Sequence, residues 1–133
     1  MNNEHQFYLD RCLELAEAAK AAGESAVGSV IVKDGQIIGE GIEQSRQLKD
    51  VTRHAEVMAV LDATFKGYQL AGATLYSNVE PCLLCTYVIR HHRIGRVVFS
   101  KPCGELGSTN PRFNLLTTNE LGPRSNAPEV IIL

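Results

Sequence analysis

The sequence predicts an α/β protein, a three-layer α/β/α sandwich around a five-stranded mixed sheet whose first two strands form a hairpin. Two apolar runs flank Asp34-Gly35, and three later apolar runs each follow a segment of helical composition. Strands separated by helices favour parallel pairing through right-handed crossovers, whereas the hairpin is antiparallel, so the sheet is mixed. A length of 133 residues is typical of one domain, and we expect residues 1–133 to form it.

The first helix is predicted over residues 4–22, because its apolar spacing suits an amphipathic helix and Gly23 ends it. Two strands follow within residues 27–42. They lie on either side of Asp34-Gly35, a pair that favours a tight hairpin turn with positive φ. The polar stretch EQSRQLKD that comes next is expected to be a loop.

The second half of the chain alternates predicted helices and strands. A helix is predicted over residues 51–67, with Asp50 or Thr52 as its N-cap and Gly67 as its stop. The later elements are a strand at 73–79, a helix over 81–92 with Pro81 in its first turn, a strand at 96–100, a weaker helix at 112–121 and a last strand at 129–133.

Composition favours a globular protein with small partners. Hydrophobic residues make up 44% and charged residues 21%, and the sequence contains no apolar run of transmembrane length. The N-terminus lacks the basic segment and apolar core of a signal peptide, so we expect a cytoplasmic, reducing location in which cysteines are thiols or ligands. A formal net charge of -2 gives no footprint for a polyanion, and we therefore expect no nucleic-acid or membrane partner.

Two compact clusters carry the candidate chemistry, HAE at 54–56 and PCLLC at 81–85. Both clusters lie at the starts of predicted helices, at the carboxyl ends of the strands. Ligands of α/β sheets bind at that edge of the sheet. Cys82 and Cys85 are three residues apart on one face of a helix N-terminus, which favours thiolates. His54 can add a neutral imidazole, and three protein ligands with an open fourth position are the pattern of a catalytic zinc.

Glu56 follows His54 by two residues and is spare in this ligand count. If His54 lies in the first turn of its helix, both side chains can face one pocket. The carboxylate is then placed to transfer protons beside a water held at the open position.

These clusters resemble the zinc-dependent cytidine deaminase superfamily, in which an H-x-E helix and a P-C-x-x-C helix bind the metal. TLYSNVEPCLLC and HRIGRVVFS are similar to the branch that contains tRNA adenosine deaminase, bacterial guanine deaminase and fungal cytosine deaminase. The similar stretch covers roughly residues 7–100, and residues 101–133 match poorly. The resemblance implies a cytidine deaminase-like fold, a Zn²⁺ cofactor and a homodimer.

Carried over by position, the resemblance assigns zinc to His54, Cys82 and Cys85 and the general acid/base role to Glu56. It also implies that the backbone N–H groups of Ala55 and Cys82 face the substrate. The implied reaction is hydrolytic deamination of an amino-bearing carbon in an aromatic heterocycle, with release of ammonia.

The substrate expected from the sequence is a free nucleobase or a similar small heterocycle. The negative net charge favours it, as does the end of the chain after the last strand, without the C-terminal helix of the family's tRNA deaminases. The alternative is adenosine in tRNA. A zinc-stabilised binding module without turnover is a third hypothesis, which would leave Glu56 idle.

Three further residues are candidates for substrate contact. Glu43 stands where members of the family commonly have Asn, and an ionised carboxylate accepts hydrogen bonds but donates none. It therefore favours rings that offer an N–H, such as isocytosine, guanine or an aminotriazine, with cytosine possible; alternatively, Glu43 points to solvent. Phe113 is expected to stack on the ring or to join the core, and Cys103 to line the pocket or to be a plain loop thiol.

The histidines and cysteines also allow other interpretations. A structural zinc needs a fourth protein ligand, which Cys12, Cys103, His91 or His92 could supply. A redox pair at C-x-x-C would leave the histidine and glutamate unexplained. We expect core packing for Cys12 and favourable interactions with the helix dipole for His91 and His92.

Overall fold

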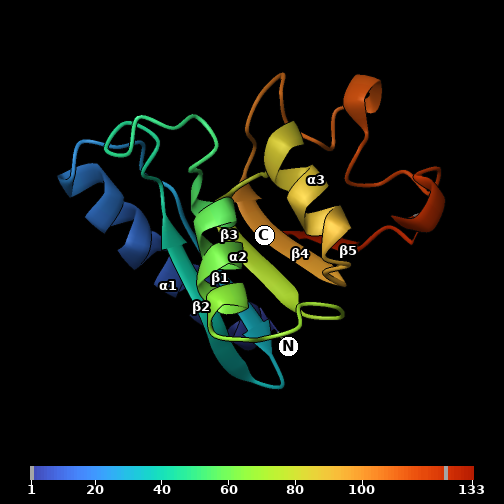
Figure 1. The fold of residues 1–133 in the computed structure, drawn as a ribbon, viewed down its shortest axis with the longest axis horizontal. Coiled ribbons are helices and arrows are strands. Elements are labelled where there is room, and N and C mark those ends of the chain that lie inside the picture. The colour runs from blue at the N-terminus through green and yellow to red at the C-terminus, as the bar shows by residue number, and fades with distance from the viewer. Residues whose placement is uncertain (1, 125) are drawn as a thin grey trace.

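The computed structural model describes residues 2–124 and 126–133, which fold into three α-helices, two short 3₁₀ turns and five strands (Figure 1). The strands are β1 (Gly28–Lys33), β2 (Gln36–Ile42), β3 (Thr74–Val79), β4 (Arg96–Lys101) and β5 (Glu129–Ile132). The helices are α1 (Asn2–Ala21), α2 (Ala55–Phe65) and α3 (Leu83–His91), and the 3₁₀ turns are η1 (Pro111–Phe113) and η2 (Gly122–Arg124).

The strands form one mixed sheet in the order β2-β1-β3-β4-β5. β1 pairs antiparallel with β2 and with β3, whereas β3 with β4 and β4 with β5 are parallel pairs. The hairpin turn between β1 and β2 has positive φ at Asp34 (52°) and Gly35 (75°), as the pair predicts. The fold class expected from the sequence is confirmed.

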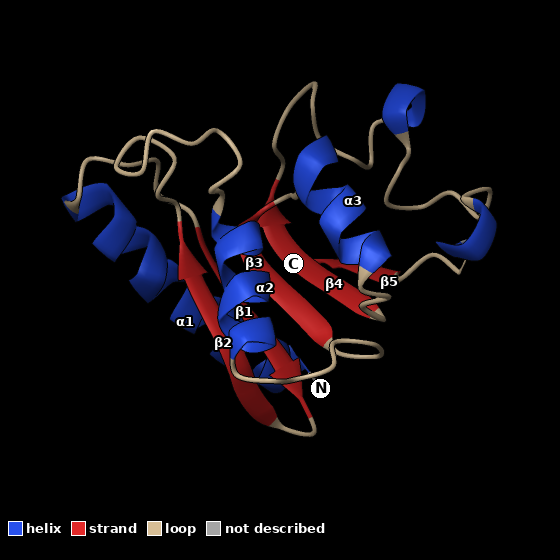
Figure 2. Cartoon of the chain, viewed as in Figure 1, coloured by secondary structure: helices blue, strands red, loops and turns tan. Residues whose placement is uncertain are grey.

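Helices cover both faces of the sheet, which gives the three layers (Figure 2). On one face α1 packs against β1 and β3 around a cluster that includes Tyr8, Cys12 and Tyr76. On the other face α2 and α3 cover a larger cluster that includes Ile31, Val60 and Ile89. Cys12 is fully buried, as expected for a core residue. Among the described helices, none is both long enough and apolar enough to span a membrane.

Close packing of α2 on β2 depends on two glycines of that strand. A Cβ on Gly41 would lie 2.4 Å from the carbonyl oxygen of Ala55 and 2.4 Å from the backbone nitrogen of Ala59. A Cβ on Gly39 would lie 2.5 Å from the carbonyl oxygen of Ala59. Only residues without a side chain permit this approach, which sets the height of the N-terminus of α2 above the sheet.

Both site helices begin later than the sequence predicts. The Oδ1 atom of Asp50 accepts hydrogen bonds from the backbone N–H of Thr52 (3.0 Å) and from its hydroxyl (2.7 Å). Because the Asp50 carboxylate is engaged in this local turn, it does not cap a helix at that point. α2 begins instead at Ala55, with His54 as its N-cap. Likewise Cys82 is the N-cap of α3, and Pro81 precedes the helix instead of lying in its first turn.

The helix predicted over residues 112–121 is absent from the described structure, which has η1 and a series of turns there. The guanidinium of Arg90 explains the difference. Its Nη1 donates to the carbonyl oxygens of Leu115 and Thr118, both at 2.8 Å, and its Nη2 donates to that of Arg124. These long-range bonds give the carbonyl groups of Leu115 and Thr118 a partner outside any continuous helix.

Candidate metal and catalytic site

Three potential metal ligands meet at the N-termini of α2 and α3. The sulfur atoms of Cys82 and Cys85 are 3.8 Å apart, and they lie 3.5 and 3.3 Å from Nδ1 of His54. A tetrahedral zinc with Zn–S near 2.3 Å and Zn–N near 2.0–2.1 Å requires separations of about 3.8 Å between sulfurs and about 3.5 Å between sulfur and nitrogen. All three separations fit that geometry within about 0.2 Å.

The ionisation of the two thiols is linked. The S–H of Cys85 donates to Cys82, and this hydrogen bond, together with the one to His54, lowers the pKa of Cys82 to about 4. The same bond and burial raise the pKa of Cys85, and the contact with Cys82 raises that of His54 to about 9. Without a metal, Cys85 and His54 therefore keep their protons beside the Cys82 thiolate, and a divalent cation is the partner that allows every ligand to lose its proton.

Glu56 lies in the first turn of α2, close to the three candidate ligands, but its carboxylate is not one of them. It is 5% exposed, and one carboxylate oxygen accepts a hydrogen bond from the hydroxyl of Ser77 at 3.4 Å. The other oxygen is 3.6 Å from the sulfur of Cys85. Burial raises the pKa of Glu56 to about 7. A carboxylate with a pKa near neutrality can both accept and donate a proton at physiological pH.

A cavity of about 170 Å³ opens onto these groups. Its lining residues come from five segments of the chain and comprise Ser25, Val27, Glu43, His54, Glu56, Val79, Glu80, Cys82 and Cys103. A larger cavity of about 690 Å³ between α2 and β2 holds none of the three ligands, so the chemistry of the lining selects the smaller cavity.

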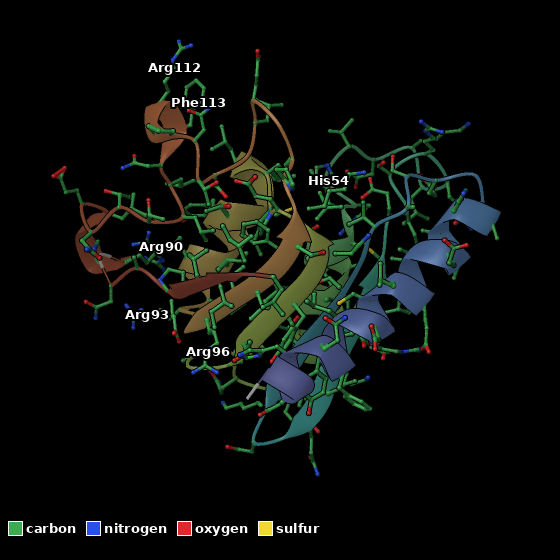
Figure 3. The ribbon with its side chains drawn as sticks, turned by 180° about the vertical axis from the view of Figure 1, so that it is seen from behind. His54, Arg90, Arg93, Arg96, Arg112 and Phe113 are labelled. Atoms are coloured by element: carbon green, nitrogen blue, oxygen red, sulfur yellow. The ribbon has the colours of Figure 1, made fainter. Side chains whose placement is uncertain are left out.

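The structure brings most of the predicted substrate-contacting residues to this cavity. Glu43 and Cys103 line it, and the carboxylate of Glu43 accepts a hydrogen bond from the hydroxyl of Ser45 at 2.7 Å. Ala55 is fully buried at the start of α2, next to His54. Phe113 does not line the cavity, because it belongs to η1, where its ring is 41% exposed beneath the guanidinium of Arg112. In Figure 3 Phe113 lies well away from His54.

Glu80 is a cavity residue to which the sequence interpretation gave no role. Its carboxylate accepts hydrogen bonds from the backbone N–H groups of Cys103 (3.1 Å) and Thr109 (2.9 Å), and these bonds together with the Thr109 hydroxyl lower its pKa against the effect of burial. It thereby anchors the 102–109 loop over the metal ligands. In the sequence, the signal that could have identified Glu80 is its position directly before Pro81-Cys82.

The chain matches the family model described as the cytidine and deoxycytidylate deaminase zinc-binding region over residues 2–101. Among curated relatives, a tRNA-specific adenosine deaminase of Haemophilus influenzae is 42% identical over 105 residues, which are 77% of this chain and 61% of that protein. A tRNA-specific adenosine deaminase of Aquifex aeolicus is 36% identical over 90% of this chain and 80% of that protein.

Solved structures agree with these matches. A structure from a study of A-to-I editing by tRNA:A34 deaminases superposes with a TM-score of 0.84 and 28% identity, and it covers 98% of this chain and 99% of its own. A guanine deaminase structure from Bacillus subtilis has a TM-score of 0.69 and 38% identity over 74% of this chain and 64% of its own. Both matches include the elements that carry His54, Cys82 and Cys85 in this chain.

Proposed function

The chain belongs to the cytidine and deoxycytidylate deaminase family defined by its zinc-binding region, and from that premise we propose that it deaminates adenosine in tRNA to inosine. The observation that carries the reaction type is the three-ligand group beside the buried carboxylate of Glu56, at the edge of a cavity. The choice of substrate is supported by relatives that are tRNA-specific adenosine deaminases.

The expected free-nucleobase substrate, and with it the expected absence of a nucleic-acid partner, is wrong in light of these relatives. The error has a physical reason. The net charge of -2 averages two unlike parts of the chain: residues 1–80 have twelve acidic and seven basic side chains, whereas residues 81–133 have six basic and three acidic. Charge asymmetry of this kind is a more direct indication of a polyanion partner than the total.

We assign the metal to His54, Cys82 and Cys85, whose spacing fits zinc. When bound, zinc supplies a Lewis acid that brings the pKa of a water molecule toward neutrality. Glu56 accepts a proton from the attacking water and passes it to N1 of adenine while the oxygen bonds to C6. Glu56 then takes the remaining proton of that water from the oxygen on C6 and transfers it to the exocyclic nitrogen, the C6–N bond breaks, and ammonia departs as the oxygen forms a carbonyl at C6.

The remaining cavity residues orient the base. The carboxylate of Glu43 is an acceptor at the cavity wall, and the exocyclic amino group of adenine offers an N–H to it. Backbone N–H groups at Ala55 and Cys82 belong to helix N-termini, where unpaired donors favour an oxygen with developing negative charge. Ser77 holds Glu56 through its hydroxyl. The homodimer stays a prediction, which sedimentation at micromolar concentration tests: a monomer would count against it.

The test is inosine formation in an anticodon stem-loop with adenosine at the wobble position, measured by mass spectrometry of the digested RNA. Free adenine, guanine, isocytosine and cytosine are assayed in parallel for ammonia release. The Glu56→Gln protein, purified in the same way, controls for contaminating deaminases. We expect inosine at the wobble position and little in a stem-loop with that adenosine moved by one nucleotide. Faster ammonia release from a free base, without inosine in the RNA, would refute the proposal.

A further inference from the structure

A second cavity, of about 440 Å³, lies at the C-terminal end of α3. Three arginines line it, Arg90, Arg93 and Arg124, together with the segments 94–95, 123–124 and 126–128. The lining includes no carboxylate among the described residues. We call this cavity, defined by its three arginines, the arginine pocket. Figure 3 shows Arg90 and Arg93 on the edge of the molecule formed by the C-terminal loops.

Arg90 forms the floor of the arginine pocket. The residue is only 2% exposed, and within residues 2–124 and 126–133 its guanidinium is held by the carbonyl oxygens of Leu115, Thr118 and Arg124. Carbonyl dipoles satisfy the N–H groups but leave the unit positive charge uncompensated. The pocket is therefore built around a fixed, buried cation.

The other two arginines have spare hydrogen-bonding capacity. Among the described residues, the Arg93 side chain makes one weak hydrogen bond, from Nη2 to the carbonyl oxygen of Pro123 at 3.4 Å, and Nε of Arg124 is buried without a hydrogen-bond partner. Within the described residues, no carboxylate lies within 4 Å of any of the three guanidiniums. Arg96 nearby differs, since it pairs with Glu129 at 2.8 Å.

His92 precedes Arg93 at the C-terminal end of α3. The pKa of His92 is lowered, first by burial and then by the charges of His91 and Arg124. A site that presents planar N–H donors and has no acidic lining residue in the described part of the chain is suited to a phosphate, which guanidinium groups bind through paired hydrogen bonds.

We propose that the arginine pocket binds a backbone phosphate of the RNA substrate, through Arg93 and Arg124, at a distance from the base that reacts. This inference rests on the proposed function. Cys82 and Arg93 stand at opposite ends of α3, eleven residues apart, which corresponds to roughly 16 Å along a helix. A free base or nucleoside cannot reach both places, whereas a structured RNA has phosphates on either side of the target nucleotide. The pocket thus helps to distinguish a polymer from a small heterocycle.

The experiment compares wild type with Arg93→Gln/Arg124→Gln in filter binding of whole tRNA over a range of salt concentrations. Each lost phosphate contact should reduce the slope of log K against log salt by about 0.9, which is roughly an eightfold weaker affinity at 0.1 M salt. The double variant should therefore bind about 60-fold more weakly, with a slope smaller by about 2. Its kcat for inosine formation at saturating RNA should stay near the wild-type value, because neither side chain touches the zinc cavity.

Lys20→Gln is the matched control, since it removes a cation from the end of α1 and should leave the salt slope unchanged. Arg90 is kept because it holds the loop carbonyls, and thermal melting verifies that the double variant is folded. Unchanged affinity and slope in the double variant would overturn the proposal. So would binding of inorganic phosphate or adenosine monophosphate that the substitutions abolish while tRNA affinity stays the same. Binding is measured without turnover, so a protein that forms no inosine but shows the slope change would refute the proposed function and not this site.

Discussion

Replacing Glu56 with glutamine separates the proton-transfer role from metal binding and folding. The amide has the size of the carboxyl group and can accept the hydrogen bond from Ser77, which is buried as Glu56 is. It is neutral, like the protonated form that burial already favours by raising the pKa of Glu56 to about 7. We therefore expect the variant to fold and to retain about one zinc per chain.

The loss of activity should be large because Glu56 acts twice in one turnover. A positioned general acid or base contributes roughly 10²–10⁴-fold to a rate, and here the same group serves the ring nitrogen and then the leaving amine. A fall near the upper limit, about 10⁴-fold, corresponds to roughly 5.5 kcal/mol in the activation barrier at 1.36 kcal/mol per decade. Ser77→Ala removes the hydrogen bond to Glu56 but leaves the carboxylate, so it should cost about tenfold at most.

Single-turnover formation of inosine in the anticodon stem-loop is the appropriate assay, because it removes product release from the measured rate. Zinc content and thermal melting are measured on the same preparations. A Glu56→Gln protein with one zinc and a rate within tenfold of wild type would show that the proton follows another route. A variant that loses the metal would show that the carboxylate is a ligand.

Two other substitutions address the metal and the base. Cys85→Ala should bind no zinc and melt roughly 15 °C lower, since ligand at a thousand times its Kd contributes about 4 kcal/mol to stability. Chelator-treated wild type should melt at the same temperature as this variant. Full zinc retention by the variant would contradict the ligand assignment. Glu43→Ala should raise KM for the stem-loop at least tenfold with a smaller change in kcat, because a hydrogen bond to a charged acceptor is lost. Ser45→Ala, which removes only the hydroxyl that holds Glu43, is its control, and unchanged kinetics in Glu43→Ala would show that the carboxylate does not contact the base.

Features encoded by neighbouring residues could be predicted from the sequence. The hairpin depends on Asp34-Gly35, whose backbone needs positive φ, and that requirement is local. The three metal ligands are also local signals, since a C-x-x-C pair at a helix start places two sulfurs together and few residue types bind zinc. The order of the elements then brings His54 to them, because both helix N-termini lie at the same edge of the sheet.

Features that depend on residues far apart in sequence could not be predicted in this way. The segment 112–121 has helical composition, but its carbonyl groups bind Arg90, which lies 25 to 34 positions away from its acceptors. α2 starts later than predicted for a different reason: the Asp50 carboxylate forms a turn with Thr52 and does not cap the helix. Phe113 belongs to the same segment, where it lies in η1 and does not line the cavity beside His54.

Net charge is a poor guide to RNA binding because it ignores where the charges lie. At physiological ionic strength the Debye length is about 8 Å, so a phosphate responds to the few charges near it and not to the total for a chain of 133 residues. The acidic excess lies in residues 1–80, whereas the arginine pocket draws all its cations from residues 90–124. In the described structure the three guanidiniums of this cavity have no carboxylate partner, although the net charge of the whole chain is -2. Local placement of charge, which only the fold reveals, is therefore the quantity that bears on RNA binding.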